Sequence, residues 1–462
     1  MNFLRAAGRS CLILAAALGL LAGCQKETPY VPPTRPVLPA SPQYGTPFAG
    51  VPDRQDAVIY QVNIRAFSAG GNFAGVTARL DSIKALGVNV LYLMPIHPVG
   101  AVRSVNSPYC VRDYLAVNPE FGTLTDLRAL VDAAHARGLS VMLDWVGNHT
   151  SWDHAWVAAH PDWYLRNAAG TILSPPNTNF LDVAQLNFTS APMRLALVAA
   201  MKSWVYTANI DGFRCDYSDA PPADFWQQAV DTLRRVRTHR LLLLAEGTRA
   251  SSFAAGFDYS FGFGFYYNLR SVFTGGAATN LDALNGSEYA GSTGTQQVVR
   301  YTTNHDVNGS DGTPVALFGG RAGAMAAFVI AACYKGVPMV YNGQEAGMTT
   351  PIPFPFTGVK VRWGAHPDVT RAYQQLLPAR AGSAALRHGT PVSYGTLAVC
   401  AFTKTAGPEQ ALVLVNVRST PTTYVVPAAL AGTTWTDALQ GGPVAVGTSV
   451  ALPAYGYLVL KR

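Results

Sequence analysis

Carboxylates at the ends of apolar segments are the first sign of chemistry in this sequence. Four acids stand at or just past the end of such a segment: Asp144, Asp216, Glu246 and Asp306. Acids delivered from the ends of several strands are how a parallel barrel builds an active site. Cleavage of a bond between two sugars requires a pair of carboxyl groups, one protonated and one ionised. The pattern therefore predicts carboxylate chemistry, and most simply the chemistry of glycosidic bonds.

Two of these acids have surroundings that favour opposite protonation states. Arg214 precedes Asp216 by two residues, so on a strand both side chains share a face and the cation can keep the carboxylate ionised, as a nucleophile requires. Glu246 ends the apolar run LLLLAE, where partial loss of water raises the carboxyl pKa and favours a general acid. A purely structural ion pair is the alternative for Arg214 and Asp216, and a helix cap is the alternative for Glu246.

The other two acids lie close to histidines. His305 directly precedes Asp306, and both can hydrogen-bond sugar hydroxyls if the strand has ended before them. A simple turn is the alternative for this segment. Asp144, Asn148 and His149 form the spacing D-x-x-x-N-H. Taken alone, His149 is more often a packed histidine than a ligand, and we expect Asp144 to hold the Asn148–His149 turn without a catalytic role.

A scaffold that brings strand ends together is also predicted. The eight candidate strands are residues 57–63, 88–94, 139–145, 210–216, 241–246, 257–261, 297–303 and 337–342. Several are continuous apolar runs, as expected of strands buried on both faces. Helical spacing occurs between most of them, for example over residues 125–137, which Gly138 should end, and over 223–236. This α/β alternation predicts a (β/α)8 TIM barrel over residues 51–379.

Two segments depart from the alternation. About residues 150–192, after the third strand, are rich in Trp, Pro and Asn, and are expected to be an insertion that shapes the substrate site. Residues 380–462 contain short alternating runs separated by turn residues, which predicts a C-terminal all-β domain, a β-sandwich without helices. This domain carries few acids, so a structural role is favoured over a glycan-binding module.

The N-terminal segment predicts export. In residues 1–24, Arg5 and Arg9 precede an apolar run that ends in LLAGC, which is similar to the lipobox of bacterial lipoproteins with Cys24 as the lipidated residue. Residues 25–50 are rich in Pro and are expected to form a tether. No Asp follows Cys24 directly, which is similar to lipoproteins of the outer membrane. The sequence therefore predicts an exported lipoprotein of the outer membrane, on its periplasmic or cell-surface face. An ordinary signal peptide is the alternative.

Composition excludes some partners. Of the 462 residues, 49% are hydrophobic and 13% are charged, and no Lys/Arg run accompanies the formal net charge of +7, so a nucleic-acid partner is not expected. Beyond the signal, the cysteines are isolated and contain no CxxC pair, so we expect four buried thiols and no zinc site. They are Cys110, Cys215, Cys333 and Cys400. The oligomeric state is not predicted.

Four segments taken together carry a more specific signal than any single acid. They are DWVGNHT, GFRCD, LLAEG and TNHD, in chain order. In this order they resemble the four conserved regions of the α-amylase family, glycoside hydrolase family 13. The resemblance extends over nearly the whole barrel, including the segments GVNVLYLMPIHP and GVPMVYNGQE, and the C-terminal β domain also fits.

The resemblance implies a role for each matching residue. Asp216 would be the nucleophile that forms a covalent glycosyl-enzyme, Glu246 the general acid/base, and Asp306 the third acid, which binds sugar hydroxyls and stabilises the transition state. The implied substrate-binding residues are Tyr109, His149, Arg214 and His305. For Tyr109, the alternative is a tyrosine that only packs at the barrel rim. A retaining mechanism implies that the two reacting carboxyl groups are about 5 Å apart.

Two of the departures from the family pattern bear on calcium binding, and a third places Pro108 directly before Tyr109. Gln185, in VAQLN, stands where relatives with a structural calcium have an Asp, and Asp219 and Ala220 replace a Lys-His pair after the nucleophile. Both changes remove groups that supply calcium ligands in such enzymes. The chemistry itself requires no cofactor. If calcium binds, Asn148 and Asp182 are the remaining candidate oxygen ligands.

The resemblance implies a retaining glycoside hydrolase that cleaves α-glucosidic bonds of starch or maltooligosaccharides. A glucan transferase or isomerase with the same site is the close alternative, because nothing in the sequence reports whether water or a sugar resolves the intermediate. A non-catalytic glycan-binding lipoprotein is less favoured, since all three acids are present. A metal-dependent hydrolase would need clustered ligands that the His residues do not supply.

Overall fold

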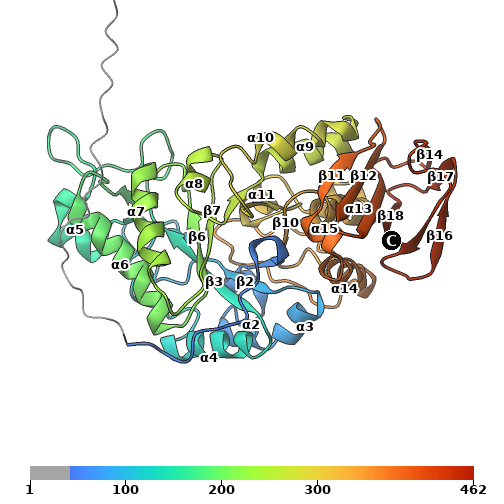
Figure 1. The fold of residues 1–462 in the computed structure, drawn as a ribbon. Helices are drawn as coiled ribbons and strands as arrows, with labels where there is room; N and C mark the ends of the chain where they lie inside the picture. The colour runs from blue at the N-terminus through green and yellow to red at the C-terminus, as the bar shows by residue number, and fades with distance from the viewer. Residues whose placement is uncertain (1–41) are drawn as a thin grey trace, which may run out of the picture. The chain divides into compact units, whose positions relative to one another are not determined.

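The structure is a computed structural model that describes residues 42–462. Its centre is a closed barrel of eight parallel strands in the order β1-β10-β9-β8-β7-β6-β3-β2 (Figure 1). The strands are β1 (Ile59–Val62), β2 (Val90–Leu93), β3 (Ser140–Val146), β6 (Gly212–Asp216), β7 (Leu242–Ala245), β8 (Tyr259–Phe261), β9 (Gln297–Arg300) and β10 (Val337–Tyr341). Each lies within or largely within one of the eight predicted segments, so the prediction of a TIM barrel is confirmed.

The barrel strands are buried along their whole length because both faces are covered. Alternate side chains such as Val90, Met142 and Leu244 point into the barrel and form one apolar cluster, while their neighbours pack on the surrounding helices in another. Inward and outward positions alternate along every strand of a closed barrel. A polar residue at an inward position near the end of a strand therefore has to face the site at that end.

Helices connect the strands and cover the outside of the barrel (Figure 1). They are α1 (Ile64–Phe67), α2 (Phe73–Thr77), α3 (Leu80–Ala85), α4 (Leu124–His135), α6 (Ala191–Thr207), α7 (Ala223–Arg234), α8 (Ala250–Ala254), α9 (Phe263–Phe273), α10 (Leu284–Ser287), α11 (His305–Ser310), α12 (Pro314–Leu317), α13 (Gly320–Cys333) and α14 (Pro367–Ala381). Both predicted helices are present, as α4 and α7. Thr123 and Asp126 form a capping box at the start of α4, and Gly138 follows it with φ 69°.

The insertion after β3 contains more regular structure than its sequence indicated. The strands β4 (His149–Ser151) and β5 (Val183–Gln185) pair antiparallel, with His149 opposite Gln185, and α5 (Ala155–Ala159) lies between them in the chain. Three-residue strands have no periodicity that a sequence can display. This pairing holds the insertion against the end of β3, at the face of the barrel where the strands end.

The C-terminal region is an all-β domain preceded by one helix that the sequence did not indicate. Its six-stranded sheet has the order β11-β12-β13-β18-β15-β16, and β14 and β17 form a separate pair. The strands are β11 (Thr390–Ser393), β12 (Val399–Ala406), β13 (Glu409–Asn416), β14 (Thr422–Val425), β15 (Thr433–Asp437), β16 (Pro443–Val446), β17 (Ser449–Leu452) and β18 (Tyr457–Lys461). Helix α15 (Ala384–His388) falls inside the segment predicted to be free of helices.

Two buried cations lie near the junction of the barrel with this domain, and one of them, Lys404, connects the two. The Nζ of Lys404, from β12, donates to the carbonyls of Tyr334 at 2.8 Å, Cys333 at 3.4 Å and Leu386. Arg380, from α14, donates to the carbonyls of Ala332, Gly336 and Gln55 at 2.9–3.2 Å. Across residues 42–462, neither cation contacts a carboxylate within ion-pair distance. Backbone dipoles alone balance these two charges.

The first described residues are packed on the barrel. The backbone N–H of Tyr44 donates to the carbonyl of Tyr206 at 2.8 Å, and its hydroxyl donates to Asp132 at 2.6 Å. The ring of Phe48 stacks on His135 with centroids 4.4 Å apart. The predicted tether of residues 25–50 is therefore attached from about Tyr44 onward. The predicted signal and Cys24 lie outside the described residues.

The structure also describes the four cysteines and the lengths of the helices. Cys110, Cys215, Cys333 and Cys400 are free and buried, which confirms the predicted thiols. Within the described part of the chain, none of the helices combines the length and apolar character needed to cross a bilayer.

Candidate active site

The end of the barrel brings all four acids to one face. Asp144 lies in β3, Asp216 is the last residue of β6, Glu246 directly follows β7, and Asp306 lies in α11, just after β9. The register pairs Asp144 with Arg214 on the neighbouring strand. Because parallel strands of a barrel end on the same side, these positions place the acids around one opening.

Arg214 is the centre of the site. Its Nη1 donates to Asp144 Oδ1 at 2.7 Å and to Asp216 Oδ1 at 2.8 Å, and its Nη2 lies 2.6 Å from Glu246 Oε1. The side chains of Arg214 and Asp144 have no exposed surface. One guanidinium therefore contacts three carboxyl groups in a space from which water is largely excluded, where electrostatic interactions are strong.

Burial and neighbouring charges act on both reacting acids. Burial raises the pKa of Asp216 to about 7; Arg214 acts in the opposite direction, and Asp144 and Asp306 act with burial. Burial raises the pKa of Glu246 well above its usual range; Arg214 again acts in the opposite direction, and Asp216 and Asp306 act with burial. Burial therefore favours the protonated form of Glu246, as a general acid requires, while Arg214 favours the ionised form of Asp216, as a nucleophile requires. Arg214 opposes the effect of burial on Asp216 but does not cancel it, contrary to the simple expectation from their spacing.

Asp144 belongs to this cluster, which corrects its predicted role. The hydroxyls of Tyr92 and Tyr109 donate to its Oδ2 at 2.5 and 3.1 Å, and its other oxygen accepts from Arg214. None of the hydrogen bonds of its carboxylate within the described chain goes to the Asn148–His149 turn. Asp144 instead fixes the position of Arg214, because its strand places it directly beside that residue.

Tyr109 and His305 lie together at the edge of the site. Their rings are 5.4 Å apart and nearly parallel at 20°, and Tyr109 Oη lies 2.7 Å from His305 Nε2. The amide of Gln61 donates to His305 Nδ1 at 2.7 Å, so Nε2 carries the hydrogen and donates to Tyr109. Burial lowers the pKa of His305. A neutral, hydrogen-bonded ring of this kind is fixed in orientation before a substrate arrives.

His149 and Asp306 occupy different surroundings. His149 is buried, its Nε2 lies 3.2 Å from the carbonyl of Tyr109, and burial lowers its pKa to about 4. It therefore supports the backbone of Tyr109. The side chain of Asp306 is 56% exposed, and its Oδ1 lies 3.2 Å from His305 Nε2. Of the three predicted catalytic acids, Asp306 is the one most open to an approaching molecule.

Three contributors were not predicted from the sequence. Gln61 orients His305, Tyr92 donates to Asp144, and the backbone N–H of Tyr217 donates to Glu246 Oε2 at 2.7 Å. The first two occupy inward positions of predicted strands, so their alternation pattern was a usable signal. The third depends on the conformation of Tyr217, whose φ of 45° lies in the left-handed region.

The residues at the candidate calcium site do not fit a cation. Gln185 Nε2 donates to the backbone carbonyls of Asn148 and Leu186 at 3.0 Å and to Asn148 Oδ1 at 3.1 Å, while Asn148 Nδ2 donates to Gln185 Oε1 at 3.1 Å. Two of the acceptors are carbonyls, so the amino end of Gln185 must face them. The amide hydrogens of Gln185 thus occupy the carbonyl oxygens that a cation would need as ligands. Across residues 42–462, there is no cluster of three His, Cys, Asp or Glu side chains suited to a metal, and Asp182 is not part of one.

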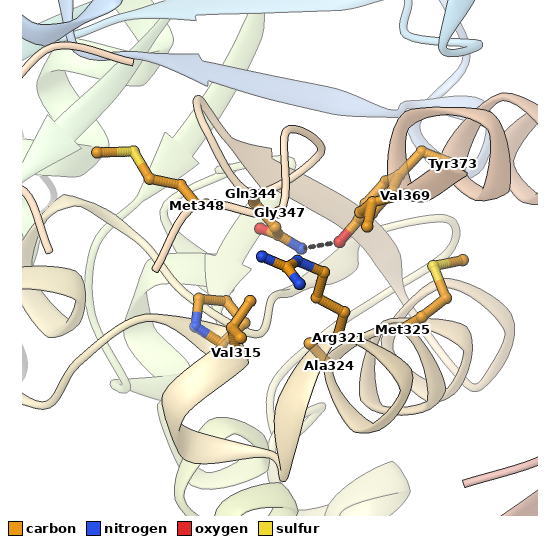
Figure 2. A pocket seen from close by; sticks show the side chains of 10 residues that line it. Val315, Arg321, Ala324, Met325, Gln344, Gly347, Met348, Val369 and Tyr373 are labelled. Atoms are coloured by element: carbon orange, nitrogen blue, oxygen red, sulfur yellow. Dashed lines mark hydrogen bonds between the residues drawn. The ribbon is translucent and has the colours of Figure 1, made fainter. Parts of the chain in front are cut away.

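Two of the hollows in the described part of the molecule bear on the location of the site. One, of about 280 Å³, is lined by Asn148 and Gln185 at the insertion and by Tyr217 and Ala220 just after the predicted nucleophile. Figure 2 shows the other, between α12, α13, α14 and the segment after β10, where Gln344 Nε2 donates to the hydroxyl of Tyr373 at 2.7 Å. The second contains none of the candidate site residues, whereas the first is lined by Tyr217, the residue after Asp216.

Comparisons with known proteins point to one family. The family model described as the alpha amylase catalytic domain matches residues 42–170. The alpha-amylase MalA of Haloarcula japonica is 29% identical over 421 residues, which cover 84% of this chain and 58% of that protein. The alpha-1,4-glucan:maltose-1-phosphate maltosyltransferase of Rhodospirillum rubrum is 29% identical over 310 residues, or 61% of this chain and 43% of that protein. The chain thus spans about half the length of these two curated relatives.

A solved structure agrees over nearly its full length. The alpha-amylase from Lactobacillus plantarum has a TM-score of 0.79 and 28% identity, covering 88% of this chain and 99% of that one. The closed barrel and the all-β C-terminal domain define a protein of the TIM-barrel class, with four acids at the rim of its barrel. The chain is therefore similar to the alpha amylase catalytic domain over residues 42–170, and to alpha-amylases over most of its length.

Proposed function

We propose that this protein is a retaining glycoside hydrolase that cleaves α-glucosidic bonds of starch or maltooligosaccharides. One observation carries the proposal: a single buried guanidinium, that of Arg214, contacts both Asp216 and Glu246. This contact supports a close spacing of the two carboxyl groups, as in enzymes that form a covalent intermediate. Burial raises the pKa of Glu246 well above its usual range, which supports its role as the acid.

The reaction then proceeds in two steps. Asp216 attacks the anomeric carbon while Glu246 gives its proton to the leaving oxygen, so the glycosidic bond breaks and a glycosyl ester forms. Glu246, now a carboxylate, takes a proton from water, and the resulting hydroxide attacks the same carbon and releases Asp216. His305 and Asp306 bind sugar hydroxyls, and the ring of Tyr109 packs on the sugar. The hollow beside Tyr217 accommodates the part of the substrate that leaves first.

Replacement of Asp216 by Asn tests this proposal. The substitution keeps the shape of the side chain and removes its charge, so turnover of maltoheptaose should be lost while the melting temperature stays close to that of the wild type. Asp224→Asn, the same change at an exposed position on α7, is the matched control and should retain activity. Near-wild-type turnover by Asp216→Asn would overturn the assignment. NMR of the first product should show the α-anomer, since two displacements retain configuration.

A glucan transferase is the second candidate, because a maltosyltransferase and trehalose synthases are among the similar proteins. The two candidates differ only in whether water or a sugar hydroxyl attacks the glycosyl-enzyme. Chromatography of the products from maltoheptaose separates them. Chains longer than the substrate would show transfer, and shorter chains alone would show hydrolysis.

We also propose that the fold does not depend on calcium. Hydrogen bonds between Gln185 and Asn148 connect the insertion to the barrel in place of a calcium ion. A chelator should then leave the melting temperature of the purified protein unchanged. A sharp decrease, reversed by added calcium, would contradict this.

For the N-terminus we propose lipidation at Cys24 and anchoring in the outer membrane of a bacterium. Cells fed a labelled fatty acid should incorporate the label into the full-length chain. The variant Cys24→Ser should lose it, while Cys110→Ser, at a buried cysteine, should keep it. Equal labelling of the first variant and the wild type would refute lipidation. Separation of the membranes by density would test the location.

A further inference from the structure

Two tyrosines of the barrel interior have a buried hydroxyl without a partner. Both Tyr259 and Tyr301 are 0% exposed, and neither hydroxyl has a hydrogen bond to any group of residues 42–462. An unpaired buried hydroxyl destabilises a protein by about 1–3 kcal/mol. Such a group in a packed interior calls for an explanation, because most buried polar atoms are paired.

The surroundings of the two hydroxyls are different. The charged groups that act on Tyr259 are Asp258 and arginines such as Arg54, which precedes β1. Tyr301 directly follows the last residue of β9, on the side where the strands end. The groups that act on it are Glu246, Asp306, Tyr266 and Tyr267. Tyr259 is the first residue of β8, at the opposite end of the barrel, so of the two only Tyr301 lies at the end that carries the catalytic acids.

Packing holds the ring of Tyr301 in place. It stacks on Tyr266 with centroids 5.5 Å apart and meets the ring of Phe261 edge-on at 5.7 Å. Phe261 also lies 5.7 Å from the guanidinium of Arg214. The hydroxyl of Tyr266 donates to Asp311 at 3.0 Å, and within the described residues it forms no hydrogen bond with Tyr301. The ring is fixed by apolar contacts, and its hydroxyl is left for a group at the site.

Glu246 is the acid with room for another donor. Its Oε1 lies against Arg214, and its Oε2 accepts from the backbone of Tyr217. A carboxylate has about four acceptor positions, so two contacts leave capacity for a third. The charged and titratable groups that face it are Arg214 and Asp216 from β6, Asp306 from α11, Tyr92 from β2 and Tyr301 after β9.

We propose that Tyr301 is a positioning residue for Glu246. After Glu246 has protonated the leaving oxygen, the hydroxyl of Tyr301 donates a hydrogen bond to the Glu246 carboxylate, directly or through one water molecule. The phenol keeps its own proton throughout. Glu246 recovers its proton from the attacking water, and the hydrogen bond then weakens. This inference rests on the proposed role of Glu246 as acid/base.

The proposal predicts the direction of a pH effect. A hydrogen bond to the ionised form of an acid lowers its pKa, so its removal raises the pKa of Glu246. The alkaline limb of kcat/KM reports the acid that must be protonated in the free enzyme. Tyr301→Phe should therefore move this limb to higher pH by about one unit and lower kcat about tenfold, since ionised Glu246 would be a less well held base.

The experiment compares Tyr301→Phe with Tyr259→Phe, using pH profiles of maltoheptaose hydrolysis. Each substitution removes one unpaired hydroxyl and leaves no cavity, so both variants should fold and melt at or above the wild-type temperature. A shift of the alkaline limb in Tyr301→Phe alone supports the inference. Coincident profiles for the two variants would overturn it and leave the proposed function intact. A wild type without turnover, by contrast, would count against the proposed function itself.

Discussion

Two buried cations, Arg214 at the barrel rim and Lys404 at the joint with the C-terminal domain, are balanced in different ways. Arg214 contacts three carboxyl groups. Lys404 contacts three backbone carbonyls. Burial lowers the pKa of Lys404 to about 7, whereas the surrounding acids raise the pKa of Arg214 well above its usual value. A buried charge is destabilising in both places, but only at the rim do other charges compensate it.

The difference shows what each region can do. The carboxylates around Arg214 can exchange protons and react, so the groups that balance its charge are also the groups proposed to react. The carbonyls around Lys404 come from the end of α13 and from α15, where the negative end of a helix dipole favours a cation. That arrangement fixes two helices to a strand and has no group that can react. Variants of each cation test whether this distinction is real.

Arg214→Met should have the largest effect. It leaves Asp144, Asp216 and Glu246 close together without a cation, and removal of one partner from a buried ionic cluster typically lowers the free energy of unfolding by about 3–5 kcal/mol. Turnover should fall by about a thousandfold or more, since the nucleophile loses its ionised state and its orientation. Denaturant unfolding and initial rates measure the two effects. Retention of both stability and activity would show that the contacts of Arg214 are incidental.

Gln185→Glu should have the next largest effect, because it replaces an amide that donates hydrogen bonds by a carboxylate that needs a cation beside it. The new carboxylate would face the carbonyls of Asn148 and Leu186, which accept but cannot donate. We expect a loss of about 2 kcal/mol in the free energy of unfolding without calcium. Added calcium should restore it, since carboxylate and carbonyl oxygens are its preferred ligands.

The control is the wild type, which should melt at the same temperature with and without calcium. Calcium-independent melting of the Glu variant would argue that these oxygens do not converge well enough to hold an ion.

The features that the sequence predicted are those encoded locally. Apolar runs separated by helical segments identified the eight barrel strands, and the acids at the ends of four of them identified the face of the site. The pairing of Arg214 with Asp216 was visible because two residues on one strand share a face. Glu246 could be placed at a strand end for the same reason.

The features that were missed depend on contacts between distant segments. The contact of Arg214 with Asp144 requires the register between β3 and β6, which no local pattern contains. Helix α15 has only five residues, and it begins where Glu409, from β13, accepts hydrogen bonds from its first backbone N–H groups. The free hydroxyl of Tyr301 became evident only from the packing around it.

Lys404→Met should change the pH dependence of stability. The pKa of Lys404 in the folded protein, about 7, lies below the ordinary value of 10.5, so the unfolded chain binds an extra proton between these pH values. Wild-type stability should therefore rise with pH in this window, by up to about 1.4 kcal/mol per pH unit from this group. The Met variant should lack this increment. Lys461→Met, at an exposed position on β18, is the control and should retain it.

A pH slope that is the same in Lys404→Met and the wild type would mean that the three carbonyls hold Lys404 charged in the folded protein. The joint would then resemble the rim more closely than its lack of carboxylate partners suggests.

Glu409→Gln should have the smallest effect and tests the dipole part of the comparison. Glu409 Oε2 accepts from the backbone N–H of Ala384 at 2.8 Å and of Ala385 at 3.4 Å, at the start of α15, while Lys404 contacts the carbonyl of Leu386 in the same helix. An anion at a helix start contributes about 0.3–1 kcal/mol, and the neutral amide should lose most of it. If both charges act through one short helix, the effects of Glu409→Gln and Lys404→Met should not add in the double variant, because residues that share a partner are coupled. Additive losses in denaturant unfolding would mean that each charge acts only on its own carbonyl or amide, and the joint would then be a set of separate hydrogen bonds.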